Sequence, residues 1–136
     1  MCAAVWPYCC GMAPNADLRF ELFPDDLERF RDFYTRVLRF EVLADRRDED
    51  GPYLYLRRGN VRIGVVPAWG KVEPLVRSPP HGVEIVIEVD DLVAERDAIT
   101  ATGYPLTEDI VERPWGLADF RLHDPDGYYL RFTTRA

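Results

Sequence analysis

The fold of this chain follows from one stretch near its end, Asp124-Pro125-Asp126-Gly127, and from the residues on either side of it. Before it stand Pro114-Trp115-Gly116 and Asp119-Phe120-Arg121-Leu122, and after it stands Tyr129-Leu130-Arg131-Phe132. The stretch predicts a loop with an exposed tryptophan, followed by two short strands that a tight turn joins. The proline fixes φ, the aspartates accept hydrogen bonds from nearby backbone N–H groups, and the glycine tolerates a positive φ. Because the flanking residues alternate, one face of this hairpin is expected to pack inward and the other to line a surface.

Composition restricts the class of protein. The chain has 136 residues, 47% of them hydrophobic, which suits one compact domain or two small repeats that share a core. Its net charge of −7 argues against binding to nucleic acid or to an anionic membrane. All three cysteines lie within the first ten residues, so the body lacks a disulfide framework and suits the reducing cytoplasm. Residues 1–16 are expected to be a disordered or mis-called extension.

The same order of elements occurs twice. Alternating residues predict a strand at the start of each half, and an aspartate pair, Asp25-Asp26 or Asp90-Asp91, then caps a helix. Gly103 ends the second helix. Three strands follow in each half, and a linker rich in proline, residues 68–82, separates the halves. The expected strands are Leu18–Phe23, Arg39–Leu43, Tyr53–Arg57, Val61–Val66, Val83–Val89, Leu106–Val111 and the closing hairpin.

The two halves align at an offset of 65 residues, which matches Asp26-Leu27 with Asp91-Leu92 and Leu38 with Gly103. An internal repeat of this length is a strong indication of architecture. We therefore expect an α+β domain over residues 17–134, made of repeat 1 (17–67), the linker and repeat 2 (83–134). Two βαβββ repeats should form a curved mixed sheet cup with the helices on the convex face.

The chain resembles the vicinal oxygen chelate superfamily, also called the glyoxalase/bleomycin-resistance/dioxygenase group. The residues that carry the resemblance are Asp26-Leu27-Glu28-Arg29, Phe33-Tyr34, Val37-Leu38-Arg39-Phe40, Val89-Asp90-Asp91-Leu92, Pro114-Trp115-Gly116 and Asp124-Pro125-Asp126-Gly127. Glu112-Arg113-Pro114-Trp115-Gly116 is most similar to the bleomycin-resistance branch. In that branch, the resemblance implies a dimer with two ligand clefts, in which the drug is bound unaltered and the tryptophan lines the cleft.

The resemblance also implies four positions for the metal ligands that the enzymes of the superfamily use. These positions fall on Arg19, Glu84 and Arg131, and on or near Gly64. Divalent cations need imidazoles or anionic oxygens, and arginine does not deprotonate, so we expect no metal and no cofactor. Ion pairs such as Arg19 with Glu84, or Arg131 with Glu21, are expected to replace the metal. His81 and His123 are expected to be solvated rather than ligands.

Aromatic residues in loops or beside the cup indicate a planar ligand, because stacking on each face adds about 0.5–1.5 kcal/mol. No residue is assigned a catalytic role. The residues expected to bind the ligand are Trp115, Trp69, Tyr53, Tyr55, Tyr129, Arg19, Glu21, Phe23, Arg62, Glu84, Arg121 and Arg131.

Three hypotheses about function follow. The first is a cytoplasmic homodimer that binds and sequesters a hydrophobic aromatic small molecule, such as an antibiotic-like natural product. The second is a metal-independent, glyoxalase-like enzyme, with a lyase, isomerase or dioxygenase type of reaction, in which Glu84, or Glu21 beside Arg131, acts as a general base. The third is an interaction domain whose cup its own side chains fill.

Overall fold

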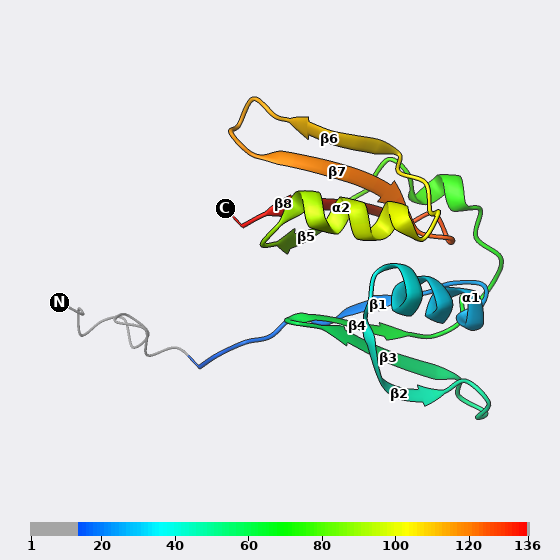
Figure 1. Ribbon diagram of the computed structural model, residues 1–136. Helices are drawn as coiled ribbons and strands as arrows, with labels where there is room; N and C mark the ends of the chain where they lie inside the picture. The colour runs from blue at the N-terminus through cyan, green and yellow to red at the C-terminus, as the bar shows by residue number, and fades with distance from the viewer. Residues whose placement is uncertain (1–13, 136) are drawn as a thin grey trace, which may run out of the picture.

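The computed structural model describes residues 14–135, so most of the expected N-terminal extension lies outside the described residues. Two halves of the chain lie one above the other, each with its helix beside its own four-stranded sheet (Figure 1). The elements are β1 (Phe20–Leu22), α1 (Leu27–Asp32), the π-helical η2 (Phe33–Val37), β2 (Glu41–Arg46), β3 (Tyr53–Arg58), β4 (Val61–Val65), the 3-10 helix η3 (Pro74–Arg77), β5 (Ile85–Val89), α2 (Leu92–Ala101), β6 (Glu108–Glu112), β7 (Ala118–His123) and β8 (Tyr129–Thr134).

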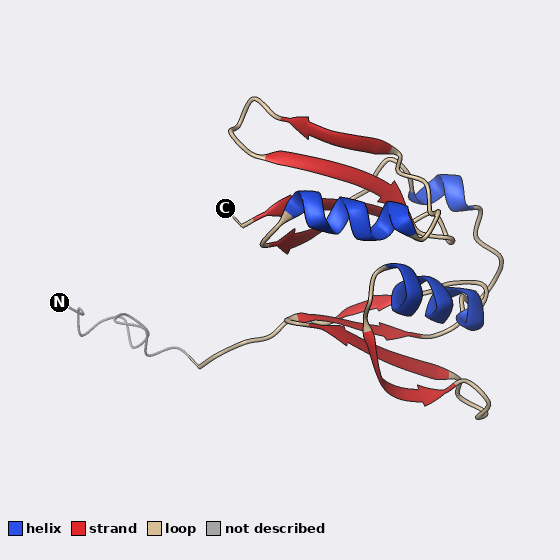
Figure 2. Ribbon diagram, in the orientation of Figure 1, coloured by secondary structure: helices blue, strands red, loops and turns tan. Residues whose placement is uncertain are grey.

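The sheets have the same topology, which confirms the expected α+β class and the repeated βαβββ order. Their strand orders are β1-β4-β3-β2 and β5-β8-β7-β6. The first strand of each half pairs in parallel with the last, and the remaining pairs are antiparallel. A parallel neighbour requires a crossover connection, and the helix of each half supplies it. Figure 2 shows the strands of both halves in red and the helices in blue.

Aspartate caps start both helices, as the sequence predicts. The Asp26 side chain accepts hydrogen bonds from the backbone N–H groups of Glu28 and Arg29, at 3.0 and 3.1 Å. Asp91 accepts one from Ala94 N at 3.0 Å. These contacts satisfy N–H groups that have no partner within the helix.

The expected alignment of the helix ends is wrong by one residue. The positive φ that ends the second helix is at Gly103, and its counterpart in the first half is Arg39 (φ 61°), not residue 38. The stretch from Asp26 to Arg39 is therefore one residue longer than the stretch from Asp91 to Gly103. The π-helical turn of η2 accommodates the extra residue, because such turns arise by insertion of a single residue into an α-helix.

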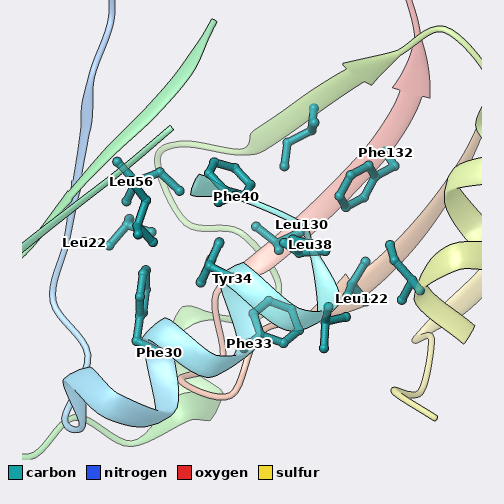
Figure 3. Packing of buried hydrophobic residues seen from close by; sticks show 14 of the residues in the cluster. Leu22, Phe30, Phe33, Tyr34, Leu38, Phe40, Leu56, Leu122, Leu130 and Phe132 are labelled. Carbon is teal, nitrogen blue, oxygen red and sulfur yellow. The ribbon is translucent and has the colours of Figure 1, made fainter. Parts of the chain in front are cut away.

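One hydrophobic core joins the halves. Figure 3 shows Phe33 and Tyr34 of η2, and Leu38 directly after it, lying beside Leu122 and Leu130 of the second sheet. All five side chains are buried. Full burial of one large apolar side chain stabilises the folded state by about 1.5–3 kcal/mol. Because Phe33 and Tyr34 pack against the second sheet, their burial stabilises the contact between the two halves.

The Asp124-Pro125-Asp126-Gly127 turn also connects the halves. Its backbone turns at Gly127 (φ 87°), where a side chain would collide with the backbone of Pro74 in the linker. Asp124 and Asp126 are both buried, although they belong to a turn. Asp126 Oδ1 accepts hydrogen bonds from Arg29 Nη2 at 2.8 Å and from Asp25 N at 3.1 Å. The turn therefore fixes the helix of the first half against the second sheet.

Candidate functional site

The face of each sheet that points away from the core is called here its outer face. In the first sheet, Leu22, Leu54 and Ile63 are buried in the core, and the residues that alternate with them lie on the outer face. Glu21, Gly64 and Tyr55 are neighbours across three adjacent strands on that face. Tyr53 and Arg62 lie on the same face, and Arg19 lies just before β1. The fold therefore brings five of the expected binding residues together there: Arg19, Glu21, Tyr53, Tyr55 and Arg62.

Gly64 makes room for an acidic side chain above the first sheet. A Cβ atom at this position would collide with the Glu21 carboxylate and would lie 2.5 Å from the Tyr53 hydroxyl. Burial raises the pKa of Tyr53, and the negative charge of Glu21 raises it further. The sequence indicated Gly64 only as a position at which a metal ligand is lacking. The packing shows that the absence of a side chain at Gly64 leaves the space that the Glu21 carboxylate occupies.

The expected ion pairs between the halves are wrong. Arg19 Nη2 pairs with Glu21 Oε1 at 2.9 Å, within the first half, and Arg131 Nη2 pairs with Glu84 Oε1 at 2.9 Å, within the second. The reason is that β1 and β5 belong to separate sheets, so each charge meets the nearest opposite charge on its own outer face.

The outer face of the second sheet carries a cluster of arginines around one buried carboxylate. Arg121 and Arg131 lie directly opposite each other on β7 and β8, an arrangement that alone would be repulsive. Asp119, only 2% exposed, accepts hydrogen bonds from Arg113 Nη2 at 2.8 Å and Arg121 Nε at 3.2 Å. Burial raises the pKa of Asp119, but the hydrogen bonds from Arg113 and Arg121 outweigh it and leave the pKa below its ordinary value. Sequence reasoning missed Asp119, although its position two residues before Arg121 places both on one face.

His123 is not simply solvated, contrary to expectation. Its Nδ1 lies 2.7 Å from the Thr107 hydroxyl, and its Nε2 forms a hydrogen bond with the Ser78 hydroxyl. Its ring also meets the edge of Tyr129, with centroids 5.2 Å apart. The histidine therefore attaches the linker to the second sheet, whereas His81 is exposed as expected.

Two of the three tryptophans of the chain, Trp69 and Trp115, lie in loops of the described residues. Trp69, in the linker, is fully exposed and lines a pocket of about 430 Å³ together with Phe23, Val72 and Arg77. Trp115 is 59% exposed at the tip of the hairpin between β6 and β7. Exposed indoles in loops are consistent with binding surfaces rather than with core packing.

A second pocket lies at the seam between the halves. It has a volume of about 350 Å³, and it brings Glu21 of the first sheet and Tyr129 of the second into one lining. Apolar side chains form much of the rest, including Phe20, Val83 and Ile85. Arg121 Nη1 donates a hydrogen bond of 3.0 Å to the Tyr129 hydroxyl, which leaves the hydroxyl proton free to reach another acceptor.

Comparison with known proteins identifies the family. The model of the Glyoxalase/Bleomycin resistance protein/Dioxygenase superfamily matches residues 18–132. The chain belongs to this superfamily. A comparison with curated proteins found no match by sequence.

Solved structures of other proteins share the fold. A bleomycin resistance determinant encoded on the transposon Tn5 superposes with a TM-score of 0.72 and 21% identity, over 89% of this chain and 98% of that one. TioX from Micromonospora sp. ML1 gives 0.70 and 22%, over 90% and 100%. A lactoylglutathione lyase from Agrobacterium tumefaciens gives 0.67 and 18%, over 89% and 94%. At these identities the superpositions establish the fold alone.

The metal centre of the superfamily's enzymes does not fit the residues of this chain. At the four positions that the resemblance implies for the metal ligands, guanidinium groups stand at two, Arg19 and Arg131, and a third falls on or near Gly64. The remaining carboxylate, Glu84, is already paired with Arg131. Within residues 14–135, no three His, Cys, Asp or Glu side chains gather in a way that could hold a metal ion. A divalent cation would face fixed positive charge here and too few donor atoms.

Proposed function

We propose that this protein binds and sequesters a hydrophobic aromatic small molecule without a metal ion, in the manner of a drug-binding resistance protein. The ligand would lie in the pocket at the seam between the halves and extend over the adjoining outer faces of the sheets toward the exposed tryptophans. Planar rings would stack on aromatic side chains, while the arginines and glutamates of the two faces would meet the polar groups of the ligand.

The seam pocket carries this proposal. It is large enough for a small organic molecule, mostly apolar, and it joins residues expected to bind the ligand from both halves, Glu21 and Tyr129. The fully exposed Trp69 adds support, because covering the apolar surface of an indole with a ligand favours binding.

The proposal includes a homodimer. No hydrogen bond or ion pair joins the expected binding residues of the first sheet, Glu21, Tyr53, Tyr55 and Arg62, to those of the second, Arg121, Tyr129 and Arg131. A partner chain would place the outer face of its second sheet against the first sheet of this chain and so close a cleft. Neither nucleic acid nor a membrane is part of the proposal, and the compartment proposed is the cytoplasm. No helix within residues 14–135 has the length and apolar character needed to cross a membrane.

Tryptophan fluorescence tests the proposal. Titration with a panel of planar antibiotics should give saturable quenching, and Trp115→Ala and Trp69→Ala should each weaken binding about tenfold. Val93→Ala, an exposed residue of α2 remote from both sheets' outer faces, is the control and should bind as the wild type does. A flat signal across the panel, or unchanged affinity in both tryptophan variants, would contradict the proposal.

The fate of the ligand separates binding from catalysis. The ligand should be recovered chemically intact after prolonged incubation, as mass spectrometry would show. Conversion to a product would instead support the metal-independent enzyme, with Glu84 or Glu21 as the candidate base.

A further inference from the structure

We propose that the outer face of the first sheet recognises a cationic group on the ligand, at a position that Arg19 of the same chain fills in the free protein. This inference rests on the proposed function and narrows its ligand class to a planar aromatic compound with a protonated amine or a similar cation. The reasons lie in one carboxylate, two tyrosine rings and the exposure of Arg19.

The carboxylate belongs to Glu21, and packing defines its position. It lies above Gly64, in space that any other residue at position 64 would fill, and beside the Tyr53 hydroxyl. Because a carboxylate accepts hydrogen bonds and attracts positive charge, the Glu21 carboxylate in this position is suited to bind an ammonium group that approaches from outside the sheet.

The tyrosine rings of the same face already hold cations. The Arg19 guanidinium lies over the ring of Tyr55, 6.0 Å from its centroid, and Arg46 lies over Tyr53 at 5.8 Å. Arg19 also pairs with Glu21 at 2.9 Å. One guanidinium of the chain thus makes the two contacts, to a carboxylate and to an aromatic face, that a cationic ligand would make.

Arg19 is held loosely enough to be displaced. The side chains of Arg19 and Glu21 are 47% and 38% exposed, and ion pairs at such exposure contribute little net free energy. Residue 19 also precedes β1, outside regular structure. The corresponding pair of the second sheet, Arg131 with Glu84, is more buried, and Arg131 also approaches Asp119 at 3.8 Å. The first sheet is therefore the face on which an external cation can replace an internal one.

Three probes that share one ring system test the inference by calorimetry at neutral pH. They are 2-naphthylmethylammonium, the neutral 2-naphthalenemethanol and the anionic 2-naphthoate. The ammonium probe should bind about tenfold more tightly than the alcohol, and the naphthoate should bind most weakly.

Two variants sharpen the test. Arg19→Gln should tighten binding of the ammonium probe about fivefold, because the internal competitor is gone. Arg57→Gln is the matched control: it removes the same charge from the same face, but Arg57 pairs with Glu41 and not with Glu21. The control should change the affinity less than twofold. Glu21→Gln should weaken the ammonium probe about tenfold and leave the affinity for 2-naphthalenemethanol unchanged.

The outcomes distinguish this inference from the function on which it rests. Equal binding of all three probes, or an equal gain in Arg19→Gln and Arg57→Gln, would overturn the cation site and leave aromatic binding intact. If none of the probes binds and the antibiotic panel also fails, the proposed function falls with it.

Discussion

The Tyr34 hydroxyl donates a hydrogen bond of 2.8 Å to Asp124 Oδ2, and both side chains are buried. This contact joins the helix of the first half to the turn of the second. Asp124 Oδ1 meanwhile accepts hydrogen bonds from the N–H groups of Asp126 and Tyr128, each at 2.9 Å. One carboxyl group therefore shapes the turn and attaches it to the other half.

Asp124 should make stability depend on pH. Burial raises its pKa from 3.8 to about 6, despite the hydrogen bond from Tyr34. Because the folded state holds this proton more tightly, its contribution to stability is full below about pH 4 and is lost as the pH rises to about 6. Asp124→Asn should remove this loss, about 2 kcal/mol, as urea unfolding between pH 4 and 7 would show. The exposed Asp97→Asn should keep the pH dependence of the wild type; an identical slope in Asp124→Asn would contradict the prediction.

Tyr34→Phe should destabilise the protein by about 1–3 kcal/mol near pH 7. The substitution keeps the ring and its packing against Phe30, at a centroid distance of 4.2 Å, but leaves Asp124 Oδ2 buried without its donor. Thermal unfolding measures the loss. If Tyr34→Phe were as stable as the wild type while Tyr34→Leu was destabilised, ring packing rather than the hydrogen bond would explain the contribution of Tyr34.

Glu95 should stabilise the junction of the halves with the opposite pH dependence. It is buried on α2 and bonds Arg58 Nη2 at 2.5 Å and Arg39 Nη2 at 2.8 Å, both from the first half. Burial raises its pKa, but Arg58 and Arg39 outweigh this and leave the pKa below 4.5. Its contribution is therefore present above about pH 4.5 and lost as the pH falls.

Glu95→Gln should cost about 2 kcal/mol at pH 7, a value reduced for the partial exposure of both arginines. The exposed pair of Glu41 and Arg57 gives a control, and Glu41→Gln should change stability by less than about 0.5 kcal/mol. Equal effects of the two variants in urea unfolding would count against a special role of Glu95.

Gly64→Ala should alter the site without unfolding the sheet. The three atoms nearest to the added Cβ belong to the ends of the Glu21 and Tyr53 side chains, which can move, and alanine is not disfavoured relative to glycine in a strand. We expect unchanged or slightly higher thermal stability, and aromatic amines should bind about fivefold more weakly. Unaltered binding of 2-naphthylmethylammonium would mean that the Glu21 carboxylate does not contact the ligand.

Removal of divalent metal should have no effect. Treatment with EDTA is expected to leave both the melting temperature and ligand binding unchanged. The reason is that three of the four positions that the resemblance implies for metal ligands fall on Arg19, on Arg131 and on or near Gly64, which supply no donor to a divalent cation. Elemental analysis of the purified protein provides the direct measurement. A stoichiometric divalent cation would contradict the assignment.

Local patterns in the sequence specify the strands and helices and their repetition. Alternation of apolar residues, the aspartate caps at Asp26 and Asp91, and the glycine of the closing turn are local signals, and each acts through a few neighbouring residues. The same patterns predicted that Tyr55, Arg121 and Arg131 would lie on faces away from the core, since side chains of a strand alternate. They also indicated the superfamily to which the chain belongs.

The pairing of charged side chains depends on how the two sheets are arranged in space. Arg19 pairs with Glu21 and Arg131 with Glu84 because two separate sheets keep the halves' outer faces apart, and no local pattern specifies that separation. The space above Gly64 and the burial of Asp119 and Asp124 likewise depend on residues distant in the chain. The sequence predicts on which face of a strand a charged residue lies. The ion-pair partner of that residue and its exposure to solvent depend on tertiary packing.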